Sequence, residues 1–375
     1  TMSVGTSTLG YANDTIDAAV IAGIRRGNMS TLNCPEEVYL AEKLIELNPW
    51  ADMVRFARTG GEANAISIRI ARAASGRDKV AVCGYHGWHD WYLAANIKDN
   101  DELKDHLLPG LDSNGVPKGL RGTVIPFTYN DLDSLKKVIS ENPDLGVVKM
   151  EVVRSVEADV EFLKGVRLLC NENNIVLIFD ECTSGFRETF GGYHSNFNVS
   201  PDLCMYGKAL GNGYAITAVV GRKEVMESAQ STFISSTFWT ERIGFVAGLA
   251  TLNEMEKIKS WDIISGIGKK VKEGWVNVAK SNGVDVSVTG LDALATFSFD
   301  IMHLERKTFL TKEMLDKGFL AANVFYPSIA HTEELLIRYL DSLNDVFYQL
   351  SQKDDEELKM SINGPICHSG FKRIN

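Results

Sequence analysis

Several features that mark particular classes of protein are scarce in this sequence of 375 residues. No uninterrupted apolar run is long enough to span a bilayer, and the mean hydropathy is only −0.08. Basic residues are outnumbered, with 39 Lys and Arg against 49 Asp and Glu and a net charge of −10. Because a phosphate backbone is bound through dense positive charge, this balance argues against nucleic acid as a main partner. The sequence contains no internal repeat and no low-complexity tract. We therefore expect a soluble globular protein that binds neither membrane nor nucleic acid.

Paired cysteines are lacking too, because the six cysteines form no CxxC pair and show no metal-ligand spacing. Four of them lie in or beside apolar runs, namely Cys83, Cys170, Cys182 and Cys204. Buried free thiols are therefore favoured over disulfides, which indicates a reducing compartment. The first residues show no charged segment followed by an apolar one, so no secretory signal is visible. We expect a cytoplasmic protein. We also expect that further residues precede Thr1, because structured-looking sequence begins almost at once.

Short apolar segments alternate with helical patterns through the first two thirds of the chain. The predicted strands cover residues 79–83, 123–127, 147–152, 175–179, 203–206 and 216–220. Helical spacing separates them, as in the segment that opens at Pro35, the one capped by Asn130 and the one around 163–170. Strands buried on both faces and separated by helices predict an α/β domain with a mostly parallel sheet.

The pattern changes from about Arg242. Residues 242–258 and 335–350 are predicted as long helices, while strand candidates such as 293–299 become fewer and shorter. The sequence therefore predicts a large α/β domain at 1–254 and a smaller α+β domain at 255–375.

A glycine pair provides the first candidate site, in Arg58-Thr59-Gly60-Gly61-Glu62 directly before a segment in helical phase. Two glycines at the start of a helix let backbone N–H groups approach an anion, and the helix dipole favours negative charge there. The pattern is typical of a phosphate site, and a plain tight turn would give it as well.

Two carboxylates, Asp180 and Glu181, end the apolar strand at 175–179 and form the second candidate. Ligands of parallel α/β sheets bind at the carboxyl ends of the strands, so Asp180 is placed to meet one. A buried carboxylate there requires a cationic partner, and a protonated heteroaromatic nitrogen would serve. The alternative is a carboxylate that caps the following turn.

Lys208 is the third candidate and follows the strand at 203–206, in Tyr206-Gly207-Lys208-Ala209-Leu210-Gly211. A lysine flanked by glycines at a strand end can approach a ligand closely and lose its charge in a desolvated pocket, as a Schiff-base lysine must. A solvated surface lysine is the other interpretation.

A fourth candidate, Tyr85-His86-Gly87-Trp88-His89, follows the strand at 79–83. An aromatic ring at this place would stack on a flat cofactor, with His86 beside it. The two histidines alone make a weak metal site because a third ligand is not evident, and we expect no metal.

Together these features are a phosphate cradle, a carboxylate for a ring nitrogen, a stacking ring and a glycine-flanked lysine, which are the parts that pyridoxal phosphate (PLP) requires. From about Thr8 to Asp300 the sequence resembles the class III aminotransferases of PLP fold type I, and within them the branch that contains glutamate-1-semialdehyde aminomutase. Residues 59–63 match the family's Ser-Gly-Thr-Glu-Ala loop, and residues 180–187 resemble its Asp-Glu-Val-x-Thr-Gly-Phe-Arg signature. The resemblance implies the fold of these enzymes, a mostly parallel large domain and a smaller C-terminal α+β domain.

The resemblance also implies roles for the residues that would hold and activate the cofactor. Lys208 falls at the position of the lysine that binds the cofactor covalently, and Asp180 at that of the aspartate that pairs with the pyridine nitrogen. Gly60 and Gly61 would contact the phosphate through their backbone N–H groups.

Further roles concern the cofactor ring and the neighbouring subunit. Tyr85 with His86 matches the family's aromatic stacking element, and Cys182, where valine is usual, would pack on the opposite face of the ring. Ser236-Thr237 resembles the Gly-Thr that reaches the phosphate of the neighbouring subunit, so the resemblance implies a homodimer in which Thr237 completes the partner's site.

The sequence departs from the family pattern at several places. Gly61 stands where a threonine hydroxyl is usual, which removes one side-chain contact to the phosphate. Glu151-Val152 replaces a Glu-Pro pair, and residues 151–180 form a shorter stretch than in the aminomutase. The segments 85–90, 238–242 and 367–371 resemble a subgroup found in surface-polysaccharide and sugar-modification pathways.

The implied function is a PLP-dependent aminotransferase that moves an amino group from an amino acid, expected to be glutamate, to a keto or aldehyde group of a sugar or small phosphorylated metabolite. Trp88, His89, Arg154 and Arg242 are candidates for contacting that acceptor, and each is equally well explained as a surface or packing residue. An intramolecular aminomutase with the same cofactor residues is the alternative. A non-catalytic relative would have lost Lys208, and a nicotinamide oxidoreductase would carry a GxGxxG motif after its first strand, which is missing here.

Overall fold

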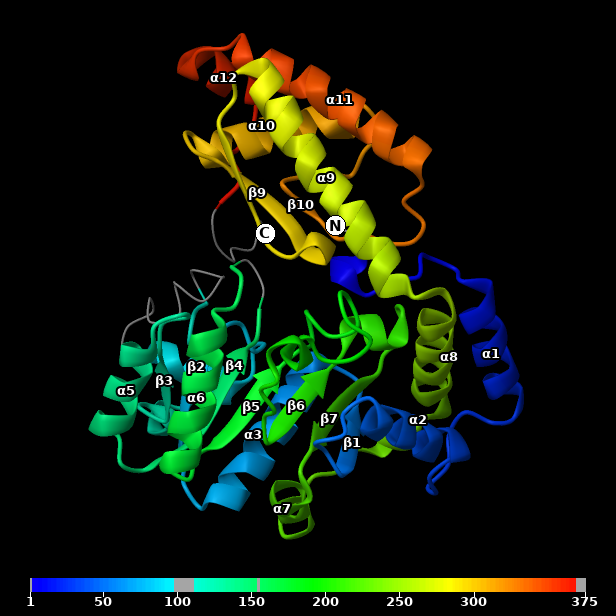
Figure 1. Cartoon of the computed structure of the whole chain (residues 1–375), viewed down its shortest axis with the longest axis vertical. Coiled ribbons are helices and arrows are strands. Elements are labelled where there is room, and N and C mark those ends of the chain that lie inside the picture. The colour runs from blue at the N-terminus through cyan, green and yellow to red at the C-terminus, as the bar shows by residue number, and fades with distance from the viewer. Residues whose placement is uncertain (1, 98–110, 154–155, 369–375) are drawn as a thin grey trace.

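The apolar segments of the first two thirds of the chain pair into one mixed sheet (Figure 1). The computed structural model describes residues 2–97, 111–153 and 156–368, and the order in this sheet is β1-β7-β6-β5-β4-β2-β3. The strands are β1 (Met53–Ala57), β2 (Lys79–Cys83), β3 (Val124–Pro126), β4 (Leu145–Glu151), β5 (Val176–Asp180), β6 (Leu203–Tyr206) and β7 (Thr217–Gly221). The predicted strands are confirmed with small shifts at their ends, and β1 is an addition to them.

The direction of the strands decides where the site lies. Strand β7 runs antiparallel to both of its neighbours, β1 and β6, while the pairs from β6 to β3 run parallel. Two reversals restore the direction, so β1 points the same way as β6. The carboxyl ends of β1, β2, β5 and β6 therefore meet at one edge of the sheet, where ligands of such folds bind.

Helices cover both faces of the sheet and build most of the remaining structure (Figure 1). Within the described ranges they are α1 (Asp14–Arg25), α2 (Pro35–Glu46), α3 (Gly60–Ser75), α4 (Asp90–Leu93), α5 (Leu132–Glu141), α6 (Val160–Glu172), α7 (Lys223–Met226), α8 (Arg242–Ile258), α9 (Ser260–Asn282), α10 (His303–Asp316), α11 (Glu333–Ser351) and α12 (Asp355–Ile362). Helix α8 has the predicted bounds. Helix α5 is capped by Asp131, whose side chain accepts from Ser134 N, and not by Asn130 as expected. None of the helices that the structure describes is both long enough and apolar enough to cross a membrane.

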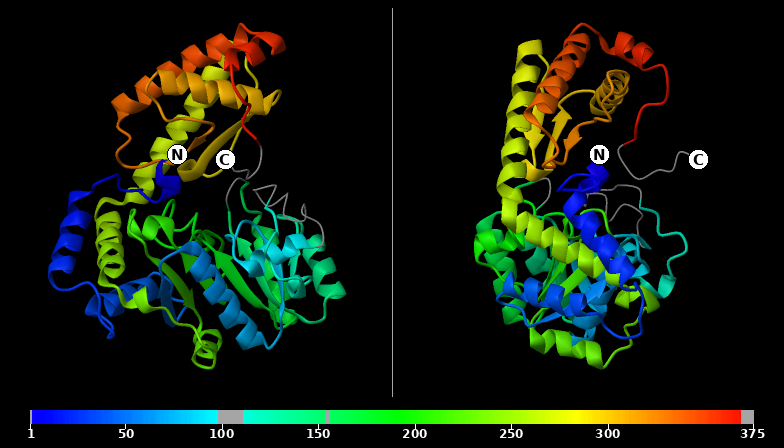
Figure 2. Two further views of the ribbon diagram at one scale, coloured as in Figure 1. Left: turned by 180° about the vertical axis from the view of Figure 1, so that it is seen from behind. Right: turned by 90° about the vertical axis from the view of Figure 1, so that its right-hand side faces the viewer.

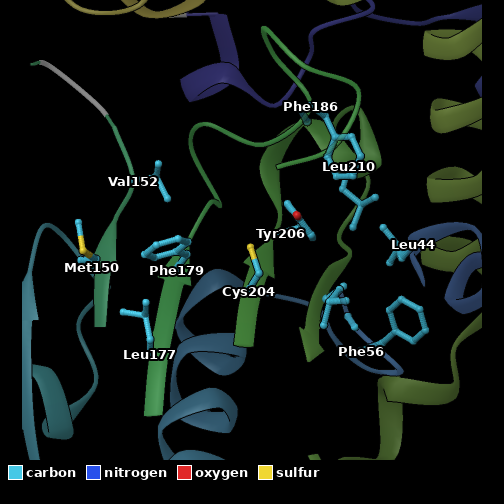
Figure 3. Close-up of a cluster of buried hydrophobic side chains, with 14 of the residues drawn as sticks. Leu44, Phe56, Met150, Val152, Leu177, Phe179, Phe186, Cys204, Tyr206 and Leu210 are labelled. Atoms are coloured by element: carbon cyan, nitrogen blue, oxygen red, sulfur yellow. The ribbon is translucent and has the colours of Figure 1, made fainter. Parts of the chain in front are cut away.

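The central strands are buried on both faces because their side chains alternate between two cores. Leu177 and Phe179 of β5 join a core that includes side chains of α2, α5, α6 and α8. Figure 3 shows these two residues beside Tyr206 in that core. Val176 and Ile178 of the same strand point the other way, toward α3. This alternation explains the continuous apolar runs in the sequence.

The C-terminal third builds a second, smaller body with a core of its own. Its antiparallel sheet has the order β10-β9-β8, with β8 (Val286–Thr289), β9 (Ala295–Phe299) and β10 (Val324–Phe325). Trp275, Phe297 and Phe347 pack in its interior. The long helix α9 leads from the part of the chain that contains the seven-stranded sheet into this second body (Figure 2). We propose the division into domains 1–254 and 255–375, close to the end of α8 at Ile258.

Candidate active site

Asp180 is the last residue of β5, and its carboxylate is held by two neighbours. Its Oδ2 lies 2.8 Å from Nδ1 of His86, and its Oδ1 accepts a hydrogen bond of 3.2 Å from the N–H of Cys182. Both side chains of the Asp180–His86 pair are buried. Burial would raise the pKa of Asp180, but the charges of Lys149 and His86 and the hydrogen bonds from His86 and Cys182 outweigh it and hold that pKa well below its usual value. Asp180 is therefore an ionised carboxylate at neutral pH.

Lys149, a residue not predicted from the sequence, makes the largest contribution to lowering the pKa of Asp180 through its charge. It lies in the middle of β4, a strand in which every residue is buried. Its Nζ donates to Ser67 Oγ at 3.2 Å and contacts Met205 Sδ at 2.8 Å. Burial lowers the pKa of Lys149, and the charge of Asp180 raises it in part. A lysine inside a buried apolar strand was the sequence signal that could have revealed it.

Lys208 follows the end of β6 and opens a short 3₁₀ helix, Lys208–Gly211. Its backbone has a φ of 41°, in the left-handed region that side chains rarely occupy. Such strain costs about 1–3 kcal/mol and is concentrated at functional sites. The Nζ atom donates to Thr183 Oγ1 at 2.7 Å, so Thr183 positions the amine. This role of Thr183 was not predicted from the sequence.

The glycine pair at the start of α3 presents free backbone donors. Thr59 caps the helix, since its Oγ1 accepts from Glu62 N at 3.3 Å and Glu62 Oε2 accepts from Thr59 N at 3.0 Å. Ala63 N bonds to the Thr59 carbonyl. Across the described residues, no acceptor takes the N–H of Gly60 or Gly61. Two unpartnered N–H groups at a helix N-terminus are suited to an anion.

Cys182 joins the glycine pair to the lysine loop. A Cβ built on Gly60 would lie 3.8 Å from Cys182 Sγ, and one built on Gly207 would lie 3.1 Å from the same sulfur. The side chain of Cys182 therefore lies against both loops. Burial raises the pKa of Cys182 far above its usual value, so it remains a neutral thiol that packs.

Tyr85 is positioned by a carboxylate on the neighbouring strand. Its N–H donates to Glu151 Oε2 at 3.0 Å, and Glu151 is the last residue of β4. Its ring meets Tyr92 edge-on, with the ring centroids 6.2 Å apart. The ring of Tyr85 is thus placed at the same edge of the sheet as Asp180, and it is only partly buried.

Other candidates from the sequence lie apart from this cluster or outside the described residues. Thr237 opens the 3₁₀ helix Thr237–Thr240 and is exposed in the single chain, as is Trp88. The Arg242 guanidinium forms an ion pair with Glu36 at 3.2 Å and donates hydrogen bonds to the carbonyls of residues 26 and 27. These contacts give Arg242 a packing role. Arg154 lies outside the described residues.

A buried group of Glu181, His194 and Cys204 brings three ligand types together within 4.8 Å. The Glu181 carboxylate already accepts from the Ser184 hydroxyl, from the N–H groups of Tyr193 and His194, and from His194 Nδ1. Burial also raises the pKa of Cys204 well above its usual value, whereas metals bind the thiolate. We therefore assign this group to the support of the loop that follows β5.

The chemistry of the clustered residues fits PLP. Gly60 and Gly61 offer unpartnered N–H groups for a phosphate, ionised Asp180 can hold a proton on a ring nitrogen, and Lys208 offers an amine for an aldehyde. These residues come from segments as far apart in the chain as 60 and 208, and the sheet brings them to one edge.

Comparison with known proteins agrees with this arrangement. Residues 1–351 match the family model described as Aminotransferase class-III. A 3-aminobutyryl-CoA aminotransferase of Cloacimonas acidaminovorans (strain Evry) is 37% identical over an alignment of 300 residues that covers 78% of this chain and 68% of that protein.

Solved structures of low sequence identity share the fold. The PLP internal aldimine form of the FumI protein of Sphingopyxis sp. MTA144 gives a TM-score of 0.85 at 23% identity, covering 94% of this chain and 84% of that one. An omega-transaminase from Sphaerobacter thermophilus gives 0.84 at 24% identity, covering 93% and 86%. The predicted α/β fold of PLP fold type I is thus confirmed. By its family match and its relative, the chain belongs to the class III aminotransferases, enzymes that use pyridoxal phosphate.

Proposed function

We propose that this chain transfers amino groups with PLP held covalently by Lys208. The observation that carries the proposal is the meeting of Lys208, ionised Asp180 and the free N–H groups of Gly60 and Gly61 at one edge of the sheet. Gly60 and Gly61 would bind the phosphate, and Asp180 would pair with the ring nitrogen. His86 would orient Asp180 through the bond of 2.8 Å.

When bound, PLP supplies an aldehyde that takes up an amino group and a ring that withdraws electrons. Lys208 would hold the cofactor through Nζ, and the same amine would serve as the base that carries the proton during amino transfer. Thr183 Oγ1, at 2.7 Å, holds Nζ at that place. A buried carboxylate of low pKa favours a cation beside it, so Asp180 would hold a proton on the ring nitrogen. Tyr85 and Cys182 would flank the two faces of the ring.

A homodimer with shared sites is part of the proposal. Thr237 is exposed in the single chain, and Phe233 and Phe238 of the same segment are 83% and 65% exposed. Large apolar side chains gathered on a surface mark a site of protein contact. A second copy that covers this segment would bury both rings and bring Thr237 to the phosphate of its neighbour.

The proposed donor is glutamate, and the proposed acceptor is a keto or aldehyde group of a sugar or small phosphorylated metabolite. Segments 85–90 and 238–242 support this acceptor through their resemblance to the sugar-pathway subgroup of the branch with glutamate-1-semialdehyde aminomutase. A second candidate acceptor is a coenzyme A thioester of a 3-oxo acid, because a relative of 37% identity is named for 3-aminobutyryl-CoA. An aminomutase with the same cofactor residues would keep the amino group on one substrate.

The test begins with the full chain saturated with PLP and reduced with borohydride. Mass mapping should find the cofactor on Lys208 and leave buried Lys149 unmodified, and Lys208→Ala should abolish both labelling and turnover. Adding glutamate to the unreduced protein should bleach the visible band, and the correct acceptor should restore it. Restoration by a keto sugar supports the first acceptor, and restoration by a 3-oxoacyl-CoA supports the second. A band that glutamate leaves unchanged would favour the aminomutase, and a label elsewhere would refute the role of Lys208.

A further inference from the structure

The imidazole of His89 lies directly over the second glycine of the anion cradle. A Cβ built on Gly61 would lie 3.0 Å from Nε2 of His89, 3.3 Å from Cδ2 and 3.6 Å from Cε1. Real Cβ atoms rarely come so close to another group, so the ring occupies the space that a side chain at position 61 would need. The nearest ring atom is a nitrogen that can donate a hydrogen bond.

The loop that carries His89 rests on the same glycine. Gly87 has a φ of +92°, and a Cβ built on it would lie 3.6 Å from the Cα of Gly61. The backbone of residue 87 therefore packs against the start of α3. This contact holds the loop against the start of α3, where the ring of His89 lies at the position that a Cβ of Gly61 would take.

The ring of His89 is positioned but has no hydrogen-bond partner. Its backbone caps α4, where its carbonyl accepts from Tyr92 N at 2.9 Å, and its side chain makes no capping bond. Trp88 packs edge-on against the ring, with centroids 4.8 Å apart. In the described part of the chain, neither ring nitrogen of His89 is within hydrogen-bond reach of a partner, so Nε2 is left for a ligand.

The two arginines near the glycine pair, Arg58 and Arg69, donate hydrogen bonds to backbone carbonyls of another segment. The Arg58 guanidinium donates to the carbonyls of Phe238, Trp239 and Glu241. Arg69 donates to the carbonyl of Phe233 at 3.0 Å. Within the described residues, these hydrogen bonds thus direct both guanidinium groups to the carbonyls of residues 233, 238, 239 and 241 and not to the glycine pair. A phosphate group has several oxygens that accept hydrogen bonds. A hydrogen bond to a charged oxygen is stronger than one between neutral groups.

We propose that His89 binds the phosphate of PLP through Nε2, beside the backbone donors Gly60 and Gly61. In this chain the donor comes from the loop after β2, because Gly61 has no side chain to supply one. The inference rests on the proposed function, since that proposal places the phosphate at the glycine pair. It makes Gly61 and His89 an interdependent pair: the glycine leaves the space, and the histidine fills it and contacts the ligand.

The first experiment compares two ligands on the full-length cofactor-free chain. Dissociation constants of PLP and of pyridoxal, which lacks the phosphate, are measured by quenching of tryptophan fluorescence. His89→Ala should weaken binding of PLP about tenfold or more and leave binding of pyridoxal unchanged. His89→Gln keeps an N–H donor and should recover part of the loss. His303→Ala, which alters a histidine of α10 in the second body, is the matched control and should bind both ligands as the wild type does.

The second experiment uses the space that the ring fills. Gly61→Thr should weaken PLP binding, because its Cβ would meet His89 at 3.0 Å. Combining it with His89→Ala removes the clash and offers a hydroxyl to the phosphate, so the double variant should bind PLP more tightly than either single variant. Additive losses in the double variant would contradict the pairing.

The outcomes separate this inference from the function on which it rests. Failure of the wild type to bind PLP or to be labelled at Lys208 would remove the proposed function itself. Binding of PLP that His89→Ala leaves unchanged, or equal weakening of PLP and pyridoxal, would overturn only the role of His89. A change confined to the KM of the acceptor would likewise overturn it and assign His89 to the substrate.

Discussion

Nδ1 of His86 and Oδ2 of Asp180 lie 2.8 Å apart at the carboxyl edge of the sheet, and both side chains are buried. The pair joins the loop after β2 to the end of β5. A carboxylate whose orientation is fixed by a hydrogen bond on one side can use the oxygen lone pairs on its other side to bind a ligand. The contact with His86 helps to keep the buried carboxylate of Asp180 ionised when no cofactor is bound.

Replacing Asp180 by Asn preserves the shape of this side chain and removes its charge. We expect turnover to fall by about a hundredfold or more, because the proposed role of Asp180 is to keep the ring nitrogen protonated and Asn carries no charge to do so. Labelling of Lys208 by PLP and borohydride should persist, since the lysine and the phosphate donors are intact. Steady-state kinetics and mass mapping on the same preparation check both parts. Wild-type turnover in Asp180→Asn would remove Asp180 from the mechanism.

Lys149 predicts a dependence of stability on pH. Burial lowers the pKa of Lys149, so the folded protein binds this proton less readily than the unfolded chain does. The free energy of unfolding should therefore rise as the pH increases from the lowered folded value toward about 10.4, the usual value for lysine. Lys149→Met should lack this contribution. Urea unfolding of the cofactor-free protein between neutral and alkaline pH measures it, and equal pH slopes in the two proteins would show that Lys149 does not titrate in this way.

Much of the large sheet could be predicted because its strands are buried on both faces and appear as continuous apolar runs. Strand β1 was not predicted, since it lies at the edge of the sheet and its residue Arg55 interrupts the pattern. Helix α9 was not predicted either, because glycines interrupt its sequence. One of them, Gly268, lets the helix pack on the backbone of Asp292, where a Cβ would have no room.

The candidate site shows a similar limit. Asp180 and Lys208 were predictable because each stands at the end of an apolar strand, where parallel sheets bind ligands. Thr183 was not, because its contact with Lys208 spans 25 residues of sequence and depends on how two loops meet. The contact of His89 with Gly61 depends in the same way on the packing of one loop against another. Local sequence patterns do not reveal such contacts between separate loops.

Cys182 packs between two backbone loops, and we expect valine, the residue usual in the family, to replace it with little effect. The thiol has a raised pKa and its sulfur faces Gly60 and Gly207, so its shape matters more than its chemistry. Cys182→Val should keep the affinity for PLP and the turnover within about threefold of the wild type, because it exchanges one small side chain for another apolar one of only slightly larger volume. Cys182→Phe should weaken PLP binding, because the added ring has no space between the loops. A large loss of turnover in Cys182→Val would instead give the thiol a chemical role.

Arg187 gives the last prediction, because it links three distant segments from a fully buried position. Its guanidinium donates to the carbonyls of Gly5 and Thr183 and lies over the ring of Tyr326, at 5.7 Å. Burial lowers its pKa to about 10, so the side chain is charged at neutral pH. A lysine has one donor group in place of the planar fork, and it cannot reach both carbonyls.

Arg187→Lys should lower the free energy of unfolding by about 1–3 kcal/mol, the cost of leaving a buried polar group without its partner. It should also expose the segment around Gly5 to limited proteolysis, while Arg121→Lys, at an exposed position, should change neither quantity. Unaltered urea unfolding and proteolysis in Arg187→Lys would mean that the guanidinium does not hold these segments together.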